Sequence, residues 1–172
     1  EVGATFYVQI NRQSQSACND SPVFDDFPPI VICNNEDLIY DHSATDETPG
    51  EQLVYSLCAP SVGGGTAGLN GVQAEAEMPD GVAPNPDLPP PYQDVPYQMP
   101  AYRFDRPLDA DPQLRIDPNT GLMTGRPTAT GQYVVGVCVQ EFLLGELLSE
   151  VRRDFQFNVA NCERLVFADL AI

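Results

Sequence analysis

Residues 131–159 decide the fold, and they read GQYVVGVCVQEFLLGELLSEVRRDFQFNV. Apolar residues alternate with other residues near both ends of this stretch, which is typical of β-strands that bury one face. Gly145-Glu146 suits a two-residue turn with Gly first. The sequence therefore predicts a long hairpin of strands 131–142 and 147–159. Its buried faces are expected to hold Tyr133, Val135, Val137, Val139, Phe155, Phe157 and Val159.

Shorter alternating or apolar runs precede this hairpin and predict further strands. No segment shows a long helical period, and the polar residues 11–21 predict a linker. About seven core strands separated by turn signals favour an all-β protein with a β-sandwich architecture. The additional core strands are expected at residues 30–33, 38–45, 53–58, 114–116 and 121–124.

Residues 59–112 differ in composition from the strands on either side. Ten prolines fall between Pro79 and Pro112, which predicts a long irregular insertion with polyproline II segments. Aromatic side chains spaced through it either pin the segment to a sheet or offer a stacking surface to a ligand such as a surface glycan. The residues concerned are Tyr92, Tyr97, Tyr102 and Phe104.

The charge balance excludes several classes of function. Eight basic residues, all Arg, stand against 25 acidic ones, and the net charge is −17. Nucleic-acid binding needs basic patches that this chain cannot assemble. Without any Lys, Schiff-base and P-loop chemistry are excluded too. No apolar run approaches the roughly 20 residues that a membrane-spanning helix needs, so membrane insertion is not expected.

The chain has five cysteines, and no pair has the C-x-x-C spacing of a zinc ribbon or a redox motif. Wide spacing in or beside strands favours disulfides and hence an oxidising, extracellular compartment. Buried free thiols are the alternative. The odd number leaves at least one cysteine unpaired or joined to another chain. The cysteines are Cys18, Cys33, Cys58, Cys138 and Cys162.

Several motifs carry a family resemblance. Residues 114–133 read LRIDPNTGLMTGRPTATGQY, and residues 41–55 and 152–155 add DHSATDETPGEQLVY and RRDF. These motifs resemble immunoglobulin-like, cadherin-like repeats of bacterial surface proteins, in particular a module of large secreted proteins of gliding bacteria. Together with residues 27–33, the similarity covers most of residues 22–160.

The resemblance implies an immunoglobulin-like β-sandwich over residues 22–162, with extra strands in residues 1–21 and 163–172. It also implies non-enzymatic work as a stalk, spacer, adhesin or filament component, and fold alone does not decide among these. In such sandwiches the first and last strands run parallel and side by side, so the preferred bridge is Cys33–Cys162. Cys58 and Cys138 form the second pair, although simple register does not bring them level. Cys18 is then left for another module or chain.

Calcium is the cofactor that the resemblance brings into consideration. Related modules carry D-x-D-G-D between the second and third strands, and carboxylate oxygens are ligands that Ca²⁺ prefers. The corresponding loop here offers Asp46, Glu47 and Glu51. A solvated acidic surface is the alternative. A second acidic cluster comprises Asp105, Asp109 and Asp111.

Asp41-His42-Ser43 places the residue types of a catalytic triad side by side. Neighbours in a strand point to opposite faces, so these three residues cannot form a relay among themselves. We therefore expect His42 to be a core residue and the chain to be non-enzymatic.

The two ends alternate like strands that lie outside the core. The resemblance relates residues 4–10 to the closing strand of a preceding module and residues 164–172 to the opening strand of a following one. Such strands can pair with each other, with another copy in a fibre, or with neighbouring modules of one long chain. The assembly residues would be Phe6, Val8, Ile10, Val166, Ala168, Leu170 and Ile172.

Overall fold

The computed structural model describes residues 6–17, 19–47, 50–61 and 94–162. In these residues the chain is a mostly-β protein of several sheets, and nearly all strand pairs are antiparallel. Cys18, Tyr92 and the expected C-terminal strand lie outside the described residues. The elements are β1 (Phe6–Ile10), α1 (Arg12–Ala17), β2 (Val23–Phe24), β3 (Val31–Cys33), β4 (Leu38–Asp41), β5 (Ala44–Thr45), β6 (Gln52–Cys58), β7 (Arg115–Ile116), β8 (Leu122–Gly125), β9 (Gly131–Leu143) and β10 (Glu146–Ala160).

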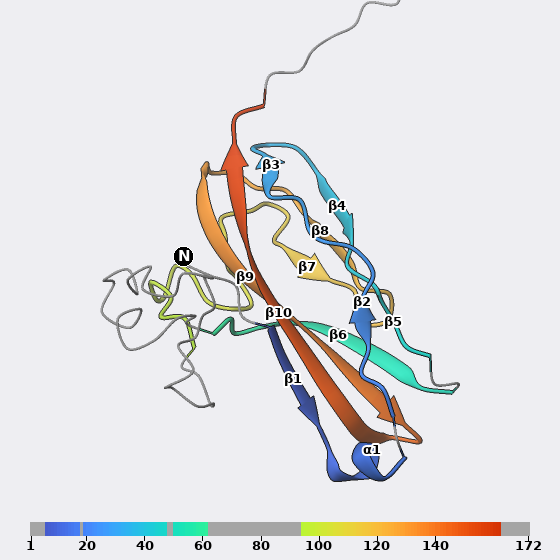
Figure 1. Ribbon diagram of the computed structural model, residues 1–172. Coiled ribbons are helices and arrows are strands. Elements are labelled where there is room, and N and C mark those ends of the chain that lie inside the picture. The colour runs from blue at the N-terminus through green and yellow to red at the C-terminus, as the bar shows by residue number, and fades with distance from the viewer. Residues whose placement is uncertain (1–5, 18, 48–49, 62–93, 163–172) are drawn as a thin grey trace, which may run out of the picture.

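β9 and β10 form the predicted hairpin, which runs the length of the molecule in Figure 1. Its turn consists of Leu144 and Gly145, whose φ angles are 52° and 85°. The expected turn at Gly145-Glu146 was therefore wrong by one residue. Positive φ at both central positions is the requirement of a two-residue type I′ turn. Gly145 adopts that conformation easily, and Leu144 is forced into it.

β10 is the central strand of a five-stranded sheet with the order β1-β10-β9-β6 and with β3 also on β10. β1 pairs antiparallel with residues 149–153, and β3 pairs parallel with residues 158–160. Figure 1 shows these two strands near opposite ends of β10. The sequence analysis placed residues 4–10 outside the core strands, whereas residues 6–10 join the sheet. β3 covers one end of the β10 edge only, so the other end has backbone groups free to pair with β1.

One hydrophobic core is shared by this sheet and by a three-stranded sheet with the order β4-β8-β7. Met123 of β8 and Phe157 of β10 are both fully buried in it. Leu108 and Ala110 belong to the core as well, although they lie in the Pro-rich insertion, where no alternation marks them. The buried members are Ile32, Leu38, Leu108, Ala110, Leu114, Met123, Val135, Val137, Phe157 and Val159.

The expected linker, residues 11–21, contains the short helix α1. Asn11, just before the helix, holds it against the start of β10. Its backbone N–H donates to the Leu148 carbonyl at 2.9 Å, and its side-chain amide donates to the Leu147 carbonyl at 2.6 Å. No helix in the described part of the chain has the length and apolar character that crossing a bilayer requires.

Candidate functional site

Two disulfides, Cys33–Cys162 and Cys58–Cys138, join strands of the five-stranded sheet, and they are the two pairs that the sequence analysis expected. Their Cα atoms lie 5.4 Å and 5.9 Å apart. The first bridge connects the end of β3 to the chain just beyond β10. Two such bridges indicate an oxidising compartment such as the extracellular space.

The second bridge is diagonal across two paired strands. Cys58 lies opposite Gly136, and Cys138 lies opposite Ser56. The two cysteines are therefore offset by two residues along the paired strands, and the disulfide joins them diagonally. Gly136 makes room for this arrangement. A Cβ atom there would collide with the Cys58 carbonyl oxygen and would lie 2.9 Å from the Pro60 nitrogen.

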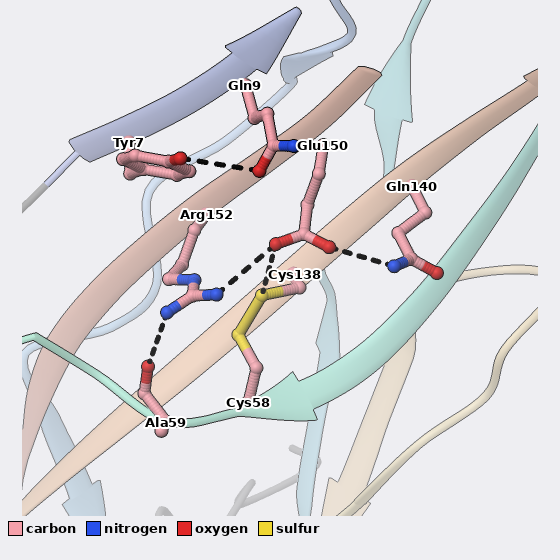
Figure 2. A network of polar contacts seen from close by, with 8 residues as sticks. All are labelled: Tyr7, Gln9, Cys58, Ala59, Cys138, Gln140, Glu150 and Arg152. Atoms are coloured by element: carbon pink, nitrogen blue, oxygen red, sulfur yellow. Dashed lines mark hydrogen bonds and ion pairs between the residues drawn. A yellow bond between two sulfur atoms is a disulfide. The ribbon is translucent and has the colours of Figure 1, made fainter. Parts of the chain in front are cut away.

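Figure 2 shows a polar network beside this bridge. Arg152 donates to the Ala59 carbonyl at 3.2 Å and pairs with the Glu150 carboxylate at 3.2 Å. Glu150 also accepts from the Gln140 side chain at 2.8 Å. The Arg152 guanidinium lies 5.7 Å from the centre of the Tyr7 ring, within cation–π range. One face of the sheet is thus tied from β1 through β10 and β9 to the residue that follows β6.

A carboxylate cluster lies where the loop between β5 and β6 meets β9. Oxygen atoms of Asp46, Glu51 and Glu141 lie within 4.8 Å of one another. Glu141 is fully buried and accepts hydrogen bonds from the Ser149 hydroxyl at 2.5 Å and from the Asn19 amide. The sequence analysis named Asp46 and Glu51 and missed Glu141, because an acidic residue within an apolar strand gives no loop signal.

The cluster keeps Glu51 protonated near neutral pH. Burial, together with the neighbouring Glu141 and Asp46 carboxylates, raises the pKa of Glu51 to about 8. Both Glu51 carboxyl oxygens are shielded from solvent, and no donor in the described residues reaches them. A proton or a cation must therefore offset the charge of this cluster. Three carboxylates and nearby side-chain oxygens form a donor set that suits Ca²⁺.

The other expected metal ligands do not join this cluster. Glu47 is exposed and lies outside it. Asp105 pairs with Arg103 at 2.8 Å. Asp109 accepts a 2.7 Å hydrogen bond from the Tyr102 hydroxyl, which raises the pKa of Tyr102 to about 12. Asp111 is exposed, and the described residues contain no metal-ligand group of three that includes it.

His42 is buried and only 1% exposed, and the structure gives it and Ser43 hydrogen-bond partners on other strands or loops and not each other. Its Nε2 atom lies 3.0 Å from the Arg153 guanidinium, so it accepts, whereas the Ser43 hydroxyl donates to Asp25 at 3.1 Å. Burial and the adjacent Arg153 lower the pKa of His42 to about 3. The imidazole is therefore neutral at physiological pH. The sequence analysis missed Arg153, which occupies a position on the apolar face of β10.

Some aromatic residues of the insertion pin it to the sheet, and one remains exposed as a surface on which a ligand could stack. Tyr102 packs against Tyr133, with ring centres 6.0 Å apart, and so pins the segment. Tyr97 is anchored by a 2.9 Å hydrogen bond from its hydroxyl to the Val134 carbonyl. Phe104 remains 44% exposed and lines a cavity of about 300 Å³ together with Tyr97.

The expected assembly residues are only partly described. Val8 and Ile10 of β1 are 49% and 45% exposed, although their strand is paired with β10. Phe6 lies in the same strand, opposite Arg153. Val166, Ala168, Leu170 and Ile172 lie outside the described residues.

No family model, curated protein or solved structure matches this sequence.

Proposed function

We propose that the chain is a non-enzymatic, extracellular structural module of a secreted bacterial surface protein. The observation that carries this proposal is the bridge Cys33–Cys162, which spans 129 positions of the sequence. By closing so large a loop, the bridge stabilises the folded chain by about 4–5 kcal/mol in the chain-entropy account.

The position of this bridge suits a module that bears tension. A pulling force follows the continuous covalent path, which runs from the N-terminal side to Cys33, crosses the disulfide, and leaves from Cys162. Residues 34–161 lie outside that path, so their sheets stay folded under load. Of the described residues, only those between 6 and 33 can unfold under this force, and they include β1 with its five residue pairs to β10.

The strand order supports an immunoglobulin-like sandwich for this module. One sheet has the order β4-β8-β7, the other β10-β9-β6, and the early strand β3 runs parallel to β10. Side chains of both sheets form one core, as in a two-layer sandwich. Tyr133 near the start of β9 donates to the Ala129 carbonyl at 3.4 Å, which resembles the tyrosine corner of such folds.

Calcium binding at the carboxylate cluster is a second part of the proposal. Asp46, Glu51 and Glu141 would hold the ion, and the Asn19 and Ser149 side chains lie against Glu141. A bound Ca²⁺ would neutralise the negative charge of these carboxylates. Because it would be held by residues of both segments, it would also join the loop before β6 to β9. The shielded oxygens of Glu51 support this assignment, because they have no donor in the described residues.

The geometry favours a multi-module stalk over a fibre built by exchange of the N-terminal strand. β1 already pairs with β10 of its own chain, so an exchange would only replace these pairs by identical ones. The half-exposed Val8 and Ile10 offer apolar surface to a neighbouring module or a second copy. Light scattering of the full chain and of Val8→Glu tests this contact, and assembly that survives the substitution contradicts it.

Single-molecule stretching between the two ends tests the load-bearing function, with Cys18→Ser as the background to avoid cross-links. In the oxidised chain only residues 6–33 should unravel, which releases about 90 Å of contour length. Cys33→Ser with Cys162→Ser should release about 260 Å, because the intact Cys58–Cys138 bridge still keeps residues 59–137 out of the stretched path. Cys58→Ser with Cys138→Ser is the matched control and should keep the short release. A long release from the oxidised background protein would contradict the proposal.

A further inference from the structure

A cavity of about 300 Å³ lies between the end of β6 and residues 94–105 of the insertion. It is large enough for a small organic ligand. Met99 and Phe104 at this cavity are 65% and 44% exposed, so large apolar side chains face solvent there instead of the core. The lining residues are Ala59, Asp94, Val95, Tyr97, Met99, Arg103, Phe104 and Asp105.

The walls of this cavity are anchored to the sheet. The Val95 backbone N–H donates to the Pro60 carbonyl at 2.8 Å, and Ser61 forms an isolated antiparallel β-bridge with Asp94. The Tyr97 hydroxyl donates to the Val134 carbonyl of β9 at 2.9 Å, which fixes the position of its ring. The cavity is therefore held open by contacts of the folded chain, and a ligand need not order it.

One lining residue of the cavity, Ala59, is held by the network of Figure 2. Ala59 lines the cavity, and its carbonyl accepts from Arg152 at 3.2 Å. Cys58, the residue before it, is bound covalently to Cys138 of β9. The disulfide and Arg152 thus fix this part of the cavity lining to the sheet.

We propose that this cavity binds a neutral carbohydrate ring. Its lining includes the apolar surfaces of Tyr97, Met99 and Phe104, against which the C–H face of a sugar can stack. It also includes hydrogen-bonding groups of both kinds: carboxylate acceptors on Asp94 and Asp105 and guanidinium donors on Arg103. A sugar carries hydroxyls that both donate and accept, so it matches this mixed rim.

The charges of the cavity favour an uncharged ligand. Arg103 is paired with Asp105 at 2.8 Å, which leaves Asp94 as the additional charge of the rim. An anionic ligand would meet this carboxylate and the −17 net charge of the whole chain. A cationic ligand is the competing class, and the test separates it from a sugar.

The test uses the full, oxidised chain on an array of neutral and acidic oligosaccharides, followed by calorimetric titration of the strongest neutral binder. Phe104→Ala should weaken its binding about tenfold, in line with the loss of one aromatic contact. Phe27→Ala is the matched control, because Phe27 is a 79% exposed phenylalanine outside the cavity and should leave affinity unchanged. Melting temperatures of both variants show whether they remain folded.

Further arms of this experiment make the proposal falsifiable. Asp94→Asn retains the size of the rim residue and should weaken a neutral glycan by several-fold at most, whereas it would abolish the binding of a cation. Titration with arginine and with choline probes the cationic class directly. Binding of these cations without any neutral glycan, an array with no binder, or equal losses in Phe104→Ala and Phe27→Ala would each overturn the proposal.

Discussion

Two polar clusters interrupt the apolar faces of β9 and β10, and they accommodate buried charge in opposite ways. In the first cluster, Arg153 is only 3% exposed, and no carboxylate forms an ion pair with it in the described part of the chain. The guanidinium lies 4.2 Å and 5.5 Å from the ring centres of Phe24 and Phe27, and it also donates to the neutral His42. Around Glu141, by contrast, three carboxylates gather within 4.8 Å of one another.

The difference shows what each cluster can do. Aromatic faces and a neutral imidazole stabilise a cation that stays permanently charged, so the Arg153 cluster is fixed. Adjacent carboxylates cannot all be ionised without a proton or a metal ion, so the Glu141 cluster responds to pH and to cations. We therefore expect cations to change the stability through the second cluster only, whereas the first cluster responds to pH through His42 alone.

The largest expected effect comes from Arg153→Ala. It removes the packing of the long side chain and leaves the buried His42 Nε2 atom without its donor, at a cost of about 3 kcal/mol. Urea denaturation measures this loss. Arg126→Ala is the control, because Arg126 forms an exposed pair with Asp37 and should cost less than about 1 kcal/mol. Equal losses in the two variants would contradict the role of the buried cluster.

Ser149→Ala should have the next largest effect. The Ser149 hydroxyl donates at 2.5 Å to the fully buried Glu141, and its removal leaves a carboxylate oxygen without that donor. The cost should be about 1–3 kcal/mol in the free energy of unfolding. Ser56→Ala, at an exposed strand position, should change stability by less than about 0.5 kcal/mol. A Ser149→Ala protein as stable as the control would show that the hydrogen bond contributes nothing net.

The two clusters should also impose opposite pH dependences. The pKa of His42 falls from 6.5 in the unfolded chain to about 3, so its contribution is present above pH 6.5 and is lost as the pH falls toward 3. The pKa of Glu51 rises from 4.5 to about 8, so its contribution is present below pH 4.5 and is lost as the pH rises through 8. Between pH 4.5 and 6.5 the two opposite changes in the free energy of unfolding with pH cancel, and stability should show a plateau.

Single substitutions should reveal each slope. Glu51→Gln should remove the alkaline loss, so that stability rises up to pH 6.5 and then stays level. His42→Gln retains an acceptor for Arg153, and its stability should fall steadily from pH 4.5 to 8. Chemical denaturation at half-unit pH steps measures both curves. Curves that keep the plateau in both variants would rule out these groups as its origin.

The strands could be predicted where apolar and polar residues alternate along the sequence. The carboxylate cluster could be predicted only for Asp46 and Glu51, which lie in an acidic loop. The hairpin and the face of Leu38, His42 and Ala44 follow from period-two patterns, because one face meets the core. Glu141 and Arg153 could not be predicted, since their roles depend on partners that strand pairing brings from distant segments. Pairing of β1 with β10 was missed for a related reason: the free edge exists only once β3 has been placed.

The smallest expected effect is the response of the Glu141 cluster to calcium. At pH 8, where Glu51 begins to ionise, about 10 mM Ca²⁺ should raise the melting temperature by about 3 °C, since an ion that binds only the folded chain stabilises it. At pH 5 the proton on Glu51 competes with the ion, and the shift should vanish.

Glu51→Gln should lose the response, whereas Glu47→Gln, in the same loop but outside the cluster, should keep it. Mg²⁺ should act more weakly, because it demands a stricter octahedral geometry. Differential scanning calorimetry measures each of these melting temperatures, and equal shifts in the two variants would mean that Ca²⁺ acts on the acidic surface as a whole.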